Sequence, residues 1–139
     1  MSARYEITEH TADVGVRAFG KSAGEACVNA ALGMLRLMIE PETVRPDQSV
    51  RIEVAGDDGV DLLVAWLQEV LYCAETRGFV FRDVELKSFS EWRIEATLRG
   101  EALDAERHEP SHEIKAVTWH NARLEQRDDQ WIAEVVFEI

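Results

Sequence analysis

Residues 4–20 of the chain read RYEITEHTADVGVRAFG, and apolar and polar residues alternate on both sides of the central segment EHTADVGV. Alternation with a period of two residues is typical of β-strands that have one buried face. The stretch therefore predicts two short strands, at residues 5–9 and 14–19, which the polar segment joins. Gly20 ends this unit, and two predicted helices follow it.

The segment SAGEACVNAALGMLRLMIEP at residues 22–41 predicts the first helix. Ser22 and Glu25 have the spacing of a capping box, in which two free backbone amides at a helix start are bonded reciprocally. Apolar residues then recur at helical spacing, and Pro41 ends the helix. The predicted buried face comprises Cys27, Ala30, Ala31, Met34, Leu35 and Met38.

The segment DDGVDLLVAWLQEVLYCAETRG at residues 57–78 predicts the second helix. Asp57 or Asp58 would cap its start through a side-chain oxygen. Gly78 would end it, because glycine readily adopts the left-handed conformation that follows many helices. The predicted buried face comprises Leu62, Leu63, Trp66, Leu67, Val70, Leu71 and Ala74.

The remaining segments alternate as strands do. With two helices against six or seven strands, mostly linked as hairpins, the predicted class is α+β, in a single domain over residues 1–139. We expect two layers, with both long helices packed on one largely antiparallel or mixed sheet. The further strands are predicted at residues 49–56, at 79–89 and 92–99 with a turn at SFSE, at 113–120, and in a final hairpin over 122–139 that turns at Asp128 and Asp129.

Composition and charge limit the classes of function. Of 139 residues, 46% are hydrophobic and 30% are charged, which is an ordinary globular balance. Lys and Arg number 15 against 27 Asp and Glu, so the formal net charge is −12, and the basic residues form no cluster. Strong direct binding of nucleic acid needs such clusters to neutralise phosphates and is not expected. The charge favours a basic protein partner or bound cations.

A cytoplasmic location without a membrane anchor is expected. No apolar run approaches the ~18 residues that cross a membrane, and the N-terminus lacks a basic segment followed by an apolar one. Cys27 and Cys73 fall on the apolar faces of the two predicted helices. We therefore expect them to be buried, reduced thiols that pack as small hydrophobic residues.

The segment HEPSH at residues 108–112 matches the zinc-protease motif H-E-x-x-H. In that motif the two histidines lie on one face of a helix and bind zinc together. Here Pro110 lies inside the motif, where it disfavours the helical conformation of Glu109 and removes a backbone donor. The sequence therefore predicts a polar loop at this place rather than a zinc site.

His10, Thr11 and Asp13 are crowded into the segment between the first two strands. An aspartate in such a segment often bonds its own backbone in an Asx-turn. The alternative is a site for a hard cation such as Ca²⁺ or Mg²⁺, which takes several oxygen ligands. If the last strand ends nearby, Glu138 and the terminal carboxylate of Ile139 would supply further oxygens. Otherwise, that strand simply ends in solvent.

Lys115 and His120 are polar residues at the two ends of one predicted strand. By alternation, Lys115 lies on the same side as Val117 and Trp119. Its alkyl stem could rest on them while the ammonium group reaches water, or it could hold an anion or a partner's carboxylate. A lone histidine at the position of His120 is more typical of a hydrogen-bonded structural residue than of a ligand.

Four blocks of the sequence, taken together, closely resemble the archease family: YEITEHTADVGVRAFG, DLLVAWLQEVLYCAETRGFVF, GEALDAERHEPSHEIKAVTWH and the terminal VVFEI. The resemblance runs in order from about Tyr5 to Ile139. It implies a protein that is not itself an enzyme and that assists the RtcB-type RNA ligase. This ligase joins tRNA halves and other broken RNAs with 2′,3′-cyclic phosphate or 3′-phosphate ends. Archeases promote guanylylation of its active-site histidine, sustain multiple turnover and broaden its nucleotide use.

The resemblance also implies a metal site. Family members bind a divalent cation through the aspartate of the H-T-A-D block and the last two residues, which correspond here to Asp13, Glu138 and Ile139. The cation would be Ca²⁺ or Mg²⁺, with Mn²⁺ as an alternative. The family usually ends in phenylalanine, aspartate and isoleucine, so Glu138 is a departure. Its extra methylene moves the carboxylate by roughly 1.5 Å, which Ca²⁺ tolerates better than Mg²⁺.

Further residues follow from the same resemblance. Lys115 matches the basic residue of the family's E-[IV]-K-A-V-T block and would contact the ligase or the nucleotide phosphates. Apart from that match, His10, Thr11 and His120 are candidates for positions around the cation, without being its main ligands. Trp119, in TWH, replaces the more usual tyrosine and lacks its hydroxyl group.

Two other functions remain open from the residues alone. The first is a standalone divalent-metal-dependent phosphoester hydrolase that uses Asp13, Glu138 and a histidine. The second is an acidic, chaperone-like protein-binding module in which the carboxylates are only a charged rim. A phosphoesterase screen would separate the first from the ligase activator, and charge-reversal variants would separate the second.

Overall fold

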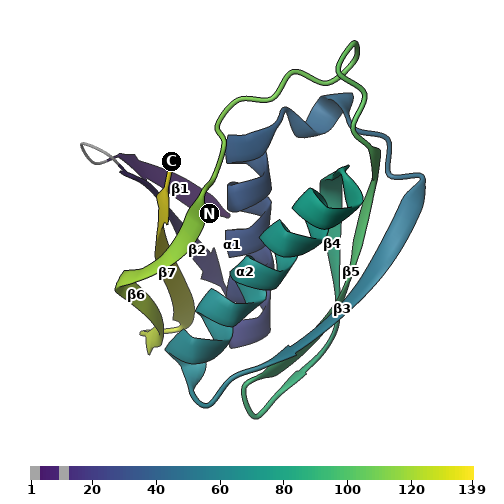
Figure 1. The fold of residues 1–139 in the computed structure, drawn as a ribbon. Helices are drawn as coiled ribbons and strands as arrows, with labels where there is room; N and C mark the ends of the chain where they lie inside the picture. The colour runs from purple at the N-terminus through teal and green to yellow at the C-terminus, as the bar shows by residue number, and fades with distance from the viewer. Residues whose placement is uncertain (1–3, 10–12) are drawn as a thin grey trace.

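The structure is a computed structural model and describes residues 4–9 and 13–139. Over these residues, seven strands form two antiparallel sheets, and two long helices lie between the sheets (Figure 1). The elements are β1 (Tyr5–Glu9), β2 (Asp13–Gly20), α1 (Ala23–Met38), the short 3-10 helix η1 (Pro41–Thr43), β3 (Gln48–Ala55), α2 (Gly59–Arg77), β4 (Phe79–Ser90), β5 (Arg93–Ala102), β6 (Ala116–Arg127) and β7 (Gln130–Glu138).

The first sheet joins the two ends of the chain. Its strand order is β1-β2-β7-β6, so β2 and β7 are neighbours in its middle. The second sheet has the order β3-β5-β4. The predicted α+β class and the strand content are confirmed. We expected two layers, one of helices and one of a single sheet. The strands instead divide between two sheets.

The composition of α1 explains why two sheets are needed. Most of its residues are buried, around nearly its whole circumference. A helix that is apolar on all sides must be covered on all sides. At one end Gly24 lies against Leu86 of β4, and further along Gly33 lies against Val16 of β2. The helix therefore packs on both sheets at once.

The predicted helix ends are largely confirmed. Ser22 Oγ accepts a hydrogen bond from the N–H of Glu25 (3.1 Å), while the Glu25 carboxylate accepts from the N–H of Lys21 (3.1 Å), one residue earlier than a capping box requires. Asp58 caps α2, and Gly78 ends it with a φ of 63°. Both predicted apolar faces are buried, except that Met38 is half-buried.

Two details of the strands were predicted wrongly. The β4–β5 hairpin turns at Glu91 and Trp92, both with positive φ, so Trp92 belongs to the turn and not to the following strand. The strands predicted at residues 113–120 and 122–127 are one strand, β6, which bulges between Thr118 and Arg123. Neither place carries the glycine or asparagine-glycine signal that marks such turns and bulges in a sequence.

The core between the sheets is apolar and contains both cysteines as buried free thiols, as predicted. Burial raises the pKa of the Cys27 thiol to about 12. The indole N–H of Trp66 in α2 donates to the carbonyl of Cys27 in α1 (2.9 Å), which ties the two helices together. Within the described residues, neither helix combines the length and apolar character needed to cross a membrane.

Candidate functional site

Asp13 and Glu138 lie directly opposite one another in the β2–β7 pair. Directly opposite residues of an antiparallel pair have Cβ atoms about 4.5–5.5 Å apart and point to the same face. The neighbouring pair, Val14 and Phe137, is buried in the core, so the alternation of the strands turns the two carboxylates to the outer face. The register therefore brings together two acidic residues from opposite ends of the chain.

The environment of this pair favours a cation. Asp13 is half-buried and Glu138 is exposed. Like charges that face each other across two strands destabilise a sheet unless a counter-charge lies between them. Ile139 directly follows Glu138, the last residue of β7, so its carboxylate lies at the same end of the sheet. Ile139 is 36% exposed.

Carboxylate oxygens are the donors that Ca²⁺, Mg²⁺ and Mn²⁺ prefer, so the residues present fit such an ion. Two side-chain carboxylates alone do not complete the six ligands of Mg²⁺ or the six to eight of Ca²⁺. Within the described residues, no group of three or more His, Cys, Asp or Glu side chains could hold a metal ion. The terminal carboxylate of Ile139, backbone carbonyls and water would have to supply the remaining oxygens.

Lys115 lies at the same end of the sheet. Its backbone N–H donates to the carbonyl of Glu138 (2.8 Å), and the next residue, Ala116, pairs with Glu138 in the β6–β7 ladder. The Lys115 side chain is exposed. The prediction that Lys115 shares one side with Val117 and Trp119 is wrong. Val117 is buried, whereas Lys115, which precedes β6, and Trp119, at the start of the bulge, are exposed.

Of the three remaining residues of the predicted site, one is described by the structure. His10 and Thr11 lie outside the described residues. His120 is exposed in the bulge of β6, where its ring Nε2 lies 3.2 Å from Nδ2 of Asn121. The structure therefore brings Asp13, Glu138, Ile139 and Lys115 to one end of the sheet and leaves His120 in the bulge.

Close packing between β1 and β2 supports the position of Asp13. Thr8 of β1 lies directly opposite Gly15 of β2, and Gly15 follows Asp13 by two residues. A Cβ atom on Gly15 would collide with Oγ1 of Thr8 and approach the carbonyl oxygen of Val135 to 3.0 Å. Only glycine therefore lets β1, β2 and β7 approach this closely beside the site.

A ladder of ion pairs crosses the same outer face and was missed by the sequence reasoning. Glu134 of β7 accepts from Arg17 of β2 (2.9 Å) and from Arg123 of β6 (2.7 Å). Burial alone would raise the pKa of Glu134, but the hydrogen bonds from the two arginines hold it below its ordinary value. Arg17 also pairs with Glu6 of β1, so the ladder joins all strands of the sheet beside the site.

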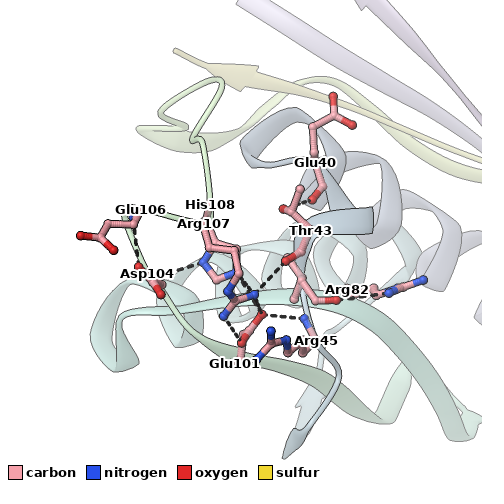
Figure 2. A network of polar contacts seen from close by, with 10 residues as sticks. Glu40, Thr43, Arg45, Arg82, Glu101, Asp104, Glu106, Arg107 and His108 are labelled. Atoms are coloured by element: carbon pink, nitrogen blue, oxygen red, sulfur yellow. Dashed lines mark hydrogen bonds and ion pairs between the residues drawn. The ribbon is translucent and has the colours of Figure 1, made fainter.

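The segment HEPSH is a loop, as predicted, but His108 in it is not an exposed polar residue. Its side chain is fully buried, and its ring lies between the backbone of Asp104 and the carboxylate of Glu101 (Figure 2). The ring of His112 instead faces the carbonyl of Leu37. The two histidines point to different partners and do not form a zinc site together.

Comparison with known proteins places this geometry in a family. Residues 5–139 match the Archease protein family (MTH1598/TM1083). Protein archease of Methanopyrus kandleri is 36% identical over 138 residues, which cover 97% of this chain and 99% of that protein. Protein archease of Thermococcus gammatolerans is 39% identical over 137 residues, which cover 96% of each chain.

Solved structures are similar over the same length. The solution structure of Methanobacterium thermoautotrophicum protein 1598 has a TM-score of 0.86 and 31% identity, and the match covers 98% of this chain and 99% of that one. The crystal structure of an archease from Thermotoga maritima, described as a possible chaperone, shares the fold over both whole chains, with a TM-score of 0.68 and 19% identity. Because the family match spans nearly the whole sequence, this chain belongs to the archease family.

Proposed function

We propose that this protein is a non-enzymatic activator of an RtcB-type RNA ligase, which promotes the metal-dependent guanylylation of the ligase and its multiple turnover in tRNA splicing or RNA repair. The observation that carries the proposal is the pairing of Asp13 with Glu138 on an outer sheet face, at the chain end that carries the Ile139 carboxylate. Membership of the archease family supports it.

Asp13, Glu138 and the terminal carboxylate of Ile139 would hold the divalent cation, which is Ca²⁺, Mg²⁺ or Mn²⁺. When bound, a divalent cation offsets the negative charge of phosphates during nucleotidyl transfer. The backbone of Lys115 is bonded to Glu138 at the same end of the sheet, and its side chain is exposed, so its ammonium group would contact the ligase or the nucleotide phosphates.

The charge of the protein supports a basic protein partner. The net charge is −12, and an RNA ligase must present basic surfaces to phosphates. Complementary charge accelerates encounter between two proteins and fixes their orientation. We therefore propose that the carboxylates at the end of the first sheet approach the ligase near its nucleotide site, while the ligase alone holds the RNA.

The experiment is a guanylylation and ligation assay with the RtcB-type ligase of the same organism, with and without this protein. The proposal predicts a faster formation of the ligase–GMP adduct and many ligation cycles per ligase instead of few. Unchanged rates at saturating concentrations of this protein would refute it.

The two rival functions are tested in parallel. A phosphoester hydrolase would cleave model phosphomonoesters or diesters with added Mn²⁺ and without any partner. A chaperone-like module would suppress aggregation of unfolded proteins, and charge reversals away from Asp13 and Glu138 would abolish its effect. If the protein is an activator of the ligase, we expect neither the phosphoester cleavage nor the suppression of aggregation.

A further inference from the structure

A buried polar cluster lies at the end of β5, remote from the carboxylate pair in sequence. Glu101 is 8% exposed, and its carboxylate accepts hydrogen bonds from both terminal nitrogens of Arg107 (2.8 and 2.6 Å) and from the backbone N–H of Arg45 (2.6 Å) (Figure 2). The hydrogen bonds from Arg107, above all, hold the pKa of Glu101 far below its ordinary range. Arg107 also donates to the carbonyl of Thr43 (3.1 Å).

His108 completes the cluster in one defined tautomer. Its Nδ1 accepts from the backbone N–H of Asp104 (2.9 Å), because a backbone amide can only donate. The ring proton is therefore on Nε2, which donates to Glu101 (3.0 Å). Both ring nitrogens are satisfied within the protein, so this buried histidine has no capacity left for an external ligand.

The cluster holds one end of a long connection, residues 103–115, which we call the strap. It runs from the end of β5 past the C-terminal end of α1 to β6 (Figure 1). Backbone N–H groups of Ser111 and His112 donate to the carbonyls of Met38 and Leu37 at the end of α1 (2.9 and 3.0 Å). The last bond of the strap is the one from Lys115 to Glu138 (2.8 Å).

Few side chains hold the strap in place. His108 and Ile114 are buried, whereas the other strap side chains are exposed or half-buried. Ordering the backbone of one residue costs about as much free energy as one isolated hydrogen bond returns, or more. A connection of this length with few backbone bonds therefore depends on its buried side chains for order.

We infer that Glu101 and His108 are positioning residues for Lys115: by tying the strap beside η1 and α1, they fix Lys115 next to Glu138. Without the cluster, the described anchors of the strap would be the bond from Leu103 to Gly78 at its start, the bonds to α1 and the buried Ile114, and the Lys115 backbone would leave Glu138 more often. The inference rests on the proposed function for the role of the Lys115 ammonium group, but not for the position of Lys115.

Hydrogen exchange of the Lys115 amide tests, without any ligase, whether Glu101 and His108 fix Lys115 next to Glu138. This amide donates to Glu138 and should exchange slowly in the intact protein. His108→Ala is expected to accelerate its exchange by about tenfold or more, while amides of the β2–β7 ladder keep their rates. Glu109→Ala, at an exposed strap residue, is the matched control and should leave the exchange rates of Lys115 and of the β2–β7 ladder unchanged. An unchanged rate at Lys115, or equal acceleration in the β2–β7 ladder, would overturn the inference.

A conservative replacement sharpens this test. His108→Gln places an amide donor near the position of Nε2, where it can reach Glu101, but has no acceptor at the position of Nδ1 for the Asp104 N–H. Exchange at Lys115 in this variant should therefore lie between the wild-type rate and the His108→Ala rate. Exchange as fast as in His108→Ala would mean that the bond to Glu101 does not hold the strap, which contradicts the inference.

The ligase assay distinguishes this inference from the proposed function. If the wild-type protein does not stimulate guanylylation, the proposed function fails, and hydrogen exchange alone decides whether the cluster ties the strap. If it does stimulate, His108→Ala should lose stimulation, and adding Lys115→Ala should cause little further loss, because both act through the same ammonium group. Additive losses would show that the cluster acts by another route and overturn the inference.

Discussion

Asp13 and Glu138 are two carboxylates on one outer face, and their repulsion sets what each contributes to stability. Without a bound cation, like charges directly opposite each other cost a sheet about 0.2–1 kcal/mol. In the proposed metal site the same pair would serve as ligands, and a bound cation would stabilise the folded state by mass action. The site should therefore be recognisable by opposite effects of one substitution in the absence and presence of metal.

Asp13→Asn is expected to raise the free energy of unfolding by about 0.2–1 kcal/mol in chelator, because it removes the repulsion from Glu138. Ca²⁺ or Mn²⁺ should raise the melting temperature of the wild-type protein, and the same variant should lose this increase. Thermal and urea unfolding with and without metal measure both effects. Asp129→Asn removes the same charge at the exposed β6–β7 turn and serves as the control. A metal-induced shift that survives in Asp13→Asn would exclude this aspartate as a ligand.

Glu138 sets a second expectation, on metal selectivity. Mg²⁺ demands nearly ideal octahedral geometry, whereas Ca²⁺ accepts longer and bidentate carboxylate contacts. Glu138→Asp shortens the side chain by one methylene and should raise the affinity for Mg²⁺ relative to Ca²⁺. Titration calorimetry with each ion gives the ratio of the two affinities. If that ratio is the same in both proteins, the length of this side chain does not determine selectivity.

At the scale of single elements, the end of α2 depends on the conformation of one residue. Gly78 has a φ of 63°, and a Cβ atom there would meet nothing within 4 Å. Gly78→Ala should therefore cost about 1 kcal/mol through backbone strain alone. Gly78→Asn should cost less, since asparagine tolerates this conformation better. Urea unfolding of both variants measures the difference, and equal losses would point to a lost contact rather than strain.

The ends of the elements show which parts of the structure are determined by residues that are neighbours in the sequence. Ser22, Asp58 and Gly78 act on neighbouring backbone groups, so their spacing alone predicted where the helices begin and end. The turn at Glu91 and Trp92 lacks glycine and asparagine, although both residues adopt positive φ. Tertiary packing holds them there, with the rings of Trp92 and Phe89 in edge contact, and sequence pattern could not show it.

The site depends on register between distant strands, which periodicity does not determine. Nothing in the spacing of residues places Asp13 opposite Glu138, and the family resemblance supplied that expectation. The role of His108 was missed because HEPSH is rich in polar residues, which normally indicates a surface loop. Glu101 and Arg107 nearby were the available signal, since a buried histidine needs charged or backbone partners.

At the scale of the whole molecule, the Glu101 cluster links stability to pH. Hydrogen bonds, first of all from Arg107, lower the pKa of Glu101 from its ordinary value of 4.5. A carboxyl group whose pKa is lower in the folded state stabilises the protein above its unfolded pKa, and this contribution is lost as the pH falls. The stabilisation should therefore be complete at neutral pH and decline below about pH 4.5.

Glu101→Gln is expected to be less stable than the wild-type protein at pH 7, and the difference should narrow as the pH falls below about 4.5. Urea unfolding at several pH values gives the two stability curves. Glu109→Gln removes an equal charge from an exposed position in the same region and should follow the wild-type curve. Parallel curves for Glu101→Gln and the wild type would contradict the lowered pKa of Glu101.

The proposed function requires the end of the first sheet, where the two ends of the chain meet, to hold a metal ion and to face an RNA ligase. The most direct measurement is single-turnover guanylylation of the purified RtcB-type ligase with GTP, in the presence of either the wild-type protein or Asp13→Asn. We predict that the wild-type protein accelerates formation of the ligase–GMP adduct and that Asp13→Asn, although folded, gives at most about a tenth of that acceleration. Equal acceleration by the two proteins would contradict the account.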